Sequence, residues 1–152
     1  MSGEATTISP APAAARGATI LEARNLRRAA ELLLDAGDWQ RFAKVAWGVY
    51  HWVFRFGDIR VYAALAERAF AQCGEAQAAA APSGQSMNVA DRAAAARLSS
   101  GVSWVRFLVG DVAGSLAAQE GLDIDEVATS DPACAALLLN ARAIALPLSD
   151  GG

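Results

Sequence analysis

The sequence predicts an all-α protein in which antiparallel helix pairs stack as a short α-solenoid of five to six helices. Along most of the chain, apolar residues recur at the three- and four-residue spacing of one helix face. The dipeptide Gly-Asp stands between such segments at residues 37–38, 57–58 and 110–111. Glycine often ends a helix and aspartate often begins one, so each dipeptide predicts a tight turn between two helices.

The composition fits one soluble-type domain with a real core. The chain has 152 residues, of which 54% are hydrophobic and 19% are charged, and this excludes general disorder. A net charge of −3 gives no indication of nucleic-acid binding. Charged residues interrupt the longest apolar stretch, and the N-terminus lacks the layout of a signal peptide. We therefore expect no membrane partner and a cytoplasmic location.

We divide the chain into a flexible N-terminal tail at residues 1–18, one helical-repeat domain at 19–148, and a tail at 149–152. Within the domain, residues 74–88 are rich in Ala, Gln, Gly and Ser. We expect a flexible loop there, and as an alternative its first residues extend the preceding helix.

The expected helices begin with residues 20–36, because Thr19 and Glu22 have the spacing of a capping box. The others are 39–56, 59–73, 90–109, 112–127 and 132–146. The segment 112–127 is the least regular, since Gly114 and Gly121 interrupt it, and it could end near Gly121.

Helix 39–56 is expected to be the spine of the stack. It contains three of the four tryptophans and is apolar nearly all round, so it must pack on more than one side. We expect helix 39–56 to pair with 59–73, and helix 90–109 to pair with 112–127. The helix at 132–146, which begins at Asp131-Pro132, has no partner in this pairing scheme. Cys73 and Cys134 fall at core-facing positions, where free buried thiols are expected and a disulfide is the alternative.

Several of these segments resemble one family of repeats. They are residues 25–29, the aromatic run that ends at Phe56, Gly57-Asp58-Ile59-Arg60 with residues 65–71, and the turn at 109–112. Over residues 21–127 the chain is similar to the tetratricopeptide-like (TPR) repeats of large bacterial transcriptional regulators and signalling ATPases. The resemblance implies a non-catalytic protein-binding scaffold, as a fragment or a stand-alone relative of such a regulator.

The sequence departs from those relatives in two respects. It lacks the phosphate-binding motif G-x-x-x-x-G-K-[ST], because its only lysine, Lys44, follows Ala43. Arg106 and Gln119 stand where the repeat usually has large apolar residues. We predict no catalytic, cofactor-binding or metal-binding residue.

A basic stripe is the candidate partner-binding site. It lies along helix 39–56 and consists of Arg41, Lys44, Gly48, His51 and Arg55, and Trp47 flanks it. In repeats of this kind the first helix of each pair lines the concave surface, so the stripe would suit an acidic peptide or a C-terminal carboxylate. The alternative is a solvated polar edge on a helix that is otherwise buried.

Two other functional interpretations remain open. The unpaired last helix could bury Leu137, Leu138 and Ile144 against a second copy, which would make the protein a homodimer. The region of Trp47, His51 and Trp52 could also bind a small molecule or act as an enzyme site. His51 is the only histidine and has no cysteine near it in sequence, which argues against a metal.

Two smaller features have structural interpretations. The acidic residues Glu120, Asp123, Asp125 and Glu126 lack the pattern of a calcium loop, so a solvated turn is expected. As an alternative, they could meet the basic stripe of a neighbouring copy. Trp104 shares a helix side with Arg97 and is expected to be a core residue, with Arg–Trp stacking as the alternative.

Overall fold

The computed structural model describes residues 13–46, 59–84 and 87–149, and these residues form helices and turns without a strand. The helices are α1 (Ala13–Asp35), α3 (Ile59–Ala80), η1 (Ala81–Ser83), α4 (Val89–Leu108), α5 (Val112–Ala117), α6 (Ile124–Ser130) and α7 (Pro132–Ser149). Residues 39–46 are also helical. The all-α class is therefore confirmed. None of the described helices is long and apolar enough to cross a membrane.

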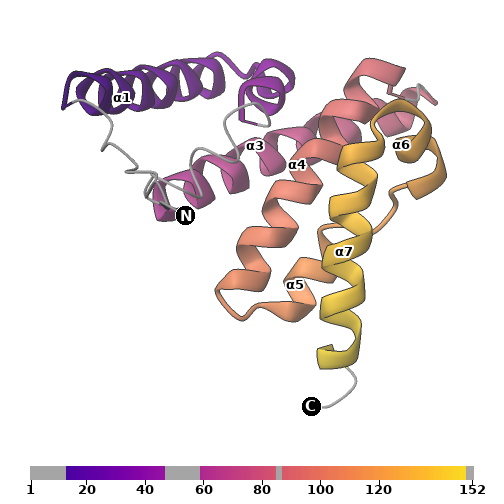
Figure 1. Cartoon of the computed structure of the whole chain (residues 1–152). Helices are drawn as coiled ribbons and strands as arrows, with labels where there is room; N and C mark the ends of the chain where they lie inside the picture. Colours follow the sequence, from indigo (N-terminus) through magenta and orange to yellow (C-terminus); the bar gives the residue numbers. More distant parts are fainter. Residues whose placement is uncertain (1–12, 47–58, 85–86, 150–152) are drawn as a thin grey trace, which may run out of the picture.

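Helix α4 is the centre of the described structure. It contacts α3 on one side and α5, α6 and α7 on the other, while α3 contacts α1. Figure 1 shows α1 lying above α3, with α4, α5 and α7 running side by side at the other end of the molecule. Each of these helices therefore packs on a helix close to it in the sequence.

The main core joins α1, residues 39–46, α3 and α4. The expected inward residues of the aromatic helix are buried as far as they are described, namely Trp39, Phe42, Ala43 and Ala46. The inward positions beyond residue 46 lie outside the described residues. A second cluster consists of Ala96, Val127, Cys134, Ala135 and Leu138, and it joins α4 to α6 and α7.

Small residues let α3 and α4 approach closely. Ala66 and Ala69 of α3 are buried, as are Ala94 and Ala95 of α4. A Cβ atom at Gly101 of α4 would lie only 3.0 Å from the hydroxyl oxygen of Tyr62 on α3. The interface therefore has no room for a larger residue at position 101 unless the tyrosine moves.

The first Gly-Asp turn forms as predicted. Gly37 has a φ of +72°, its N–H donates to the Leu34 carbonyl at 3.2 Å, and the Asp38 N–H donates to the Leu33 carbonyl at 2.9 Å. This is the Schellman arrangement that ends a helix. The Asp38 carboxylate then accepts the Arg41 N–H at 3.1 Å and caps the next helix.

The Gly110-Asp111 turn repeats the same geometry. Gly110 has a φ of +88°, its N–H donates to the Phe107 carbonyl at 3.0 Å, and the Asp111 N–H donates to the Arg106 carbonyl at 2.9 Å. The Asp111 carboxylate accepts the Gly114 N–H at 2.8 Å. Two residues thus end α4 and begin α5. The pair at residues 57–58 lies outside the described residues.

Several predicted boundaries are wrong. Helix α1 begins at Ala13, before the expected start at residue 20. The expected loop at 74–88 is mostly helical, and the alternative is correct: α3 continues to Ala80 and η1 follows directly. Alanine is the strongest helix former, and this outweighs the loop-like composition of the segment. At the other end, α7 includes Pro147 and runs to Ser149.

The segment 112–127 is not one helix, and the alternative end near Gly121 is correct. Helix α5 ends at Ala117, Gly121 has a φ of +76°, and α6 begins after Asp123. The Asp123 carboxylate caps α6 by accepting the N–H groups of Asp125 and Glu126, both at 3.1 Å.

The expectation that the last helix lacks a partner is wrong. Helix α7 packs against α4, α5 and α6. Its predicted beginning is confirmed, because the Asp131 carboxylate accepts the Cys134 N–H at 3.1 Å. Since α6 is a separate helix, it covers part of α7 that the pairing scheme left open.

Arg106 connects three helices instead of disturbing their packing. Its Nε and Nη2 atoms donate to the two carboxylate oxygens of Glu67 on α3, at 2.7 and 2.8 Å, and its Nη1 donates to the Gly114 carbonyl of α5 at 3.1 Å. The guanidinium carbon lies 5.6 Å from the centre of the Phe70 ring. The hydrogen bond with Glu67 raises the pKa of Arg106.

Gln119 is part of a buried polar cluster. It is 0% exposed, and its Nε2 donates to the Ser103 hydroxyl at 2.7 Å. That hydroxyl lies 2.9 Å from the hydroxyl of Ser115. The backbone carbonyl of Gln119 accepts a hydrogen bond from the Arg142 Nη2 of α7 at 3.1 Å. Polar contacts therefore join α4 to α5 and, through Gln119, to α7.

We expect opposite effects from two glycine substitutions. Gly110→Ala should destabilise the protein by about 1–2 kcal/mol, because alanine resists the left-handed backbone at this turn. Gly74→Ala should stabilise it by about 1 kcal/mol, because Gly74 lies inside α3 with nothing within 4 Å of an added Cβ. Urea denaturation of both variants measures the changes, and a destabilised Gly74→Ala variant would contradict the extent of α3.

A double-mutant cycle tests the Arg106–Glu67 pair. We expect Arg106→Leu and Glu67→Gln to be coupled by about 1 kcal/mol in the free energy of unfolding, because the pair has two parallel hydrogen bonds and is partly shielded. The matched control is the exposed pair Arg27–Glu31 within α1, where the coupling should be smaller. Equal coupling for both pairs would contradict a linking role for Arg106.

Candidate functional site

The structure describes only the beginning of the predicted basic stripe. Arg41 has a side chain that is 76% exposed, with its Nε 3.4 Å from a carboxylate oxygen of Asp38, and Lys44 is also exposed. These two residues lie three positions apart on one side of the helix. Trp47, His51 and Arg55 lie outside the described residues, as does Trp52.

Arg97 and Trp104 of α4 make contacts that stabilise the fold. Arg97 does not stack on the indole but donates from its Nε to the Asp131 carboxylate of α7 at 2.9 Å. Trp104 meets the ring of Phe107 edge-on, with the ring centres 5.9 Å apart.

In the part of the chain that the structure describes, no cluster of His, Cys, Asp or Glu is placed to hold a metal ion.

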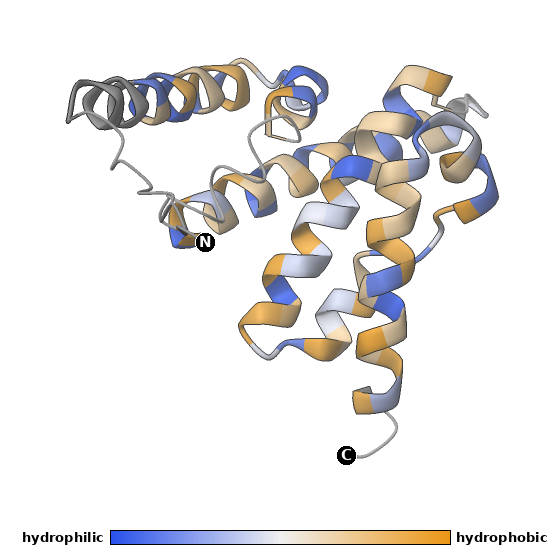
Figure 2. Cartoon of the chain, in the orientation of Figure 1, coloured by the Kyte–Doolittle hydropathy of each residue, from blue (hydrophilic) through white to orange (hydrophobic). Residues whose placement is uncertain are grey.

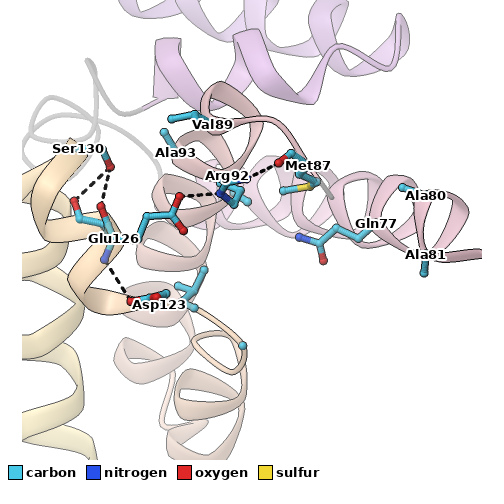
Figure 3. Close-up of a pocket in the computed structure, with 14 residues that line it drawn as sticks. Gln77, Ala80, Ala81, Met87, Val89, Arg92, Ala93, Asp123, Glu126 and Ser130 are labelled. Carbon is cyan, nitrogen blue, oxygen red and sulfur yellow. Dashed lines mark hydrogen bonds and ion pairs between the residues drawn. The ribbon is translucent and has the colours of Figure 1, made fainter. Parts of the chain in front are cut away.

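A cavity of about 410 Å³ is the strongest candidate site among the described residues. It lies between the end of α3 with η1, the start of α4, and α6 with the segment before it (Figure 3). Its wall is mostly apolar and includes Ala80, Ala81, Met87, Val89, Leu122 and Val127. Its volume is in the range of small-ligand and side-chain pockets.

An ion pair forms one side of this cavity. The Arg92 Nε of α4 donates to the Glu126 carboxylate of α6 at 2.7 Å, and the Arg92 Nη1 donates to the Met87 carbonyl. Figure 3 shows Arg92 between these two acceptors. The side chains of Arg92 and Glu126 are 39% and 42% exposed. The cavity can therefore be reached from solvent at this side.

The other polar groups of the lining also stabilise the wall. The Ser130 hydroxyl donates to the Glu126 carbonyl at 3.1 Å, and Asp123 caps α6. The Gln77 Nε2 lies 3.7 Å from the Cys73 sulfur. None of these contacts pairs a nucleophile with a general base, so the arrangement suits the binding of an apolar group better than proton transfer.

Both cysteines are free thiols inside the protein, as expected. Cys73 is 3% exposed and Cys134 is 0% exposed. Burial raises the pKa of Cys73 to about 11 and that of Cys134 to about 12, with a further contribution from Asp91 and Asp131 respectively. Both groups are therefore neutral thiols at physiological pH and are poor nucleophiles.

The surface of α7 differs from the predicted self-association face. Leu138 is 0% exposed and packs inside the chain, so a second copy cannot reach it; Leu137 is half-buried and Ile144 is 39% exposed. The large apolar residues that α7 exposes more fully are Leu139, Leu146 and Leu148. In Figure 2, hydrophobic residues are orange; orange segments are seen in the C-terminal half of α7 and at the turn between α4 and α5.

The cavity could not be predicted from the sequence, because its walls come from segments that lie far apart in the chain. Arg92 and Glu126 are 34 residues apart and share no motif. The one usable signal was the alanine-rich segment after Gly74, whose helix propensity places Gln77 and Ala80 on an extended α3. No family model, curated protein or solved structure matches this chain.

Proposed function

We propose that this protein is a non-catalytic interaction module that holds an apolar side chain of a peptide or protein partner in the cavity between α3, α4 and α6. The observation that supports this most is the combination of an accessible, mostly apolar cavity with polar groups that already have contacts inside the wall. Burial of an apolar group against this apolar wall is favourable, because it removes apolar surface from water. The resemblance to tetratricopeptide-like repeats favours the same role, in the cytoplasm.

The expected affinity is modest. Full burial of one Leu or Phe side chain contributes about 1.5–3 kcal/mol, so the cavity can anchor a partner but cannot hold it alone. Further contacts must come from the surface around the cavity or from a second site. The basic stripe that begins at Arg41 and Lys44 remains a proposed second site for an acidic segment.

A cavity-filling substitution tests this proposal. Peptides would be selected from a phage-displayed library on the full-length protein, and their affinities measured by isothermal titration. Ala93 lines the cavity on α4, so Ala93→Phe should fill part of it and weaken binding at least about tenfold, equivalent to the loss of about 1.4 kcal/mol.

The matched control is Ala64→Phe, which adds the same side chain at an exposed position of α3 outside the cavity lining. This variant should bind the selected peptides as the unaltered protein does. Circular dichroism checks that both variants are folded. If no selected peptide distinguishes Ala93→Phe from Ala64→Phe, the cavity is not the binding site.

A homodimer is the second candidate function, and the surface of α7 favours it. Among its exposed large apolar residues, Leu139 and Leu146 lie on one side of the helix, and Ile144 and Leu148 lie on roughly the opposite side. The only charged residue of α7 is Arg142, and its guanidinium donates to the Gln119 carbonyl within the chain. Two copies could therefore meet through the side that carries Ile144 and Leu148 without bringing like charges together.

The mass in solution tests the dimer. Light scattering across a concentration series should give twice the chain mass of 15.7 kDa for the unaltered protein. Ile144→Asp combined with Leu148→Asp should shift the mass to that of the monomer, because each carboxylate would lose its hydration in the interface. Leu32→Asp, at an exposed position of α1, is the control and should leave the mass unchanged. A monomer at every concentration would contradict self-association.

A further inference from the structure

The cavity has an acidic border on its α6 side. The residues from 120 to 126 include four carboxylates, Glu120, Asp123, Asp125 and Glu126, and no basic residue. Asp123 and Glu126 line the cavity, Glu120 precedes the lining residue Gly121, and Asp125 lies between the two lining carboxylates. We call these four residues the acidic border.

Internal contacts neutralise only part of this charge. Arg92 pairs with Glu126, and it is the only basic residue in the cavity lining. The N-terminus of α6 offers about half a positive charge to nearby carboxylates, which is much less than the charge of the remaining three. Glu120, Asp123 and Asp125 are all exposed. A negative potential therefore remains at the cavity mouth.

This potential favours one class of partner over another. Charges near a binding site steer and select ligands when they lie within a Debye length, which is about 8 Å at physiological ionic strength. An acidic peptide entering the cavity would meet repulsion from the border. Lys or Arg residues beside an apolar anchor would meet attraction, and their chains could also cover apolar surface.

We infer that the occupant of the cavity is a basic segment of a protein partner, with an apolar side chain inside the cavity and neighbouring Lys or Arg residues against the acidic border. The inference rests on the proposed function and adds the chemistry of the partner. The cavity would then bind a basic segment, whereas the exposed basic residues Arg41 and Lys44 suit an acidic one.

Three probe peptides of equal length test the inference. Each carries the same leucine and phenylalanine anchors, flanked by arginine, glutamine or glutamate, with a fluorescein label for anisotropy measurements on the full-length protein. The arginine peptide should bind at least about fivefold more tightly than the glutamine peptide at low salt, and the glutamate peptide should bind most weakly. The advantage of arginine should shrink as salt is added.

Matched charge variants locate the effect. Glu120→Gln with Asp125→Asn removes two charges from the acidic border and leaves the Asp123 cap in place. Glu22→Gln with Glu75→Gln removes two exposed charges from α1 and α3. Neither Glu22 nor Glu75 is next to a cavity-lining residue in the sequence, whereas Glu120 and Asp125 each are. Only the first double variant should lose the preference for arginine.

The outcomes separate the two proposals. A preference for arginine that the border variant loses and the control keeps supports the inference. If all three peptides bind equally, or the glutamate peptide binds best, and Ala93→Phe still weakens them, the inference is overturned and the cavity remains a binding site. If no peptide binds, or Ala93→Phe changes nothing, both proposals fail.

Discussion

The contacts of Arg106 fix the relation between the two ends of the described structure. One guanidinium binds both carboxylate oxygens of Glu67 on α3 and the Gly114 carbonyl of α5, while it extends from α4. A planar group with donors on several edges can satisfy such acceptors only in a narrow range of orientations. The angle at which α4 crosses α3 therefore limits where α5 can lie. It also limits the position of α7, because α7 packs against α5. The cavity depends on that angle too, because its walls come from α3, α4 and α6.

The parts of the fold that depend on local chemistry could be predicted from the sequence. Gly37 and Gly110 have the left-handed backbone, and Asp38, Asp111 and Asp131 cap helices as their positions indicated. The buried face of residues 39–46 also follows from the spacing of its apolar residues. In each case the signal and its consequence lie within a few residues of one another.

What could not be predicted depends on contacts between distant segments. The residues next to Arg106 and Gln119 in the sequence do not indicate which groups these two side chains bind. In the sequence, both therefore stand as polar exceptions among core-facing apolar positions, although in the structure they join helices. The packing of α7 against α5 and α6 could not be predicted from one continuous helix at 112–127. The chain breaks at Gly121 and forms the separate helix α6, which packs against α7. The cavity was missed for the same reason, since it exists only after three segments have been placed relative to one another.

The buried cluster of Gln119, Ser103 and Ser115 has a consequence for how the chain reaches its folded state. Helices rich in alanine and leucine can bury similar amounts of apolar surface against several different partners. Apolar contacts alone therefore give the native pairing and a shifted one nearly the same free energy. A shifted pairing of α4 would leave the two hydroxyls and the Gln119 Nε2 in an apolar interior without partners, at a cost of about 1–3 kcal/mol for each group. The cluster thus acts against mispaired intermediates, and it selects one alignment among many that the surrounding small residues would tolerate.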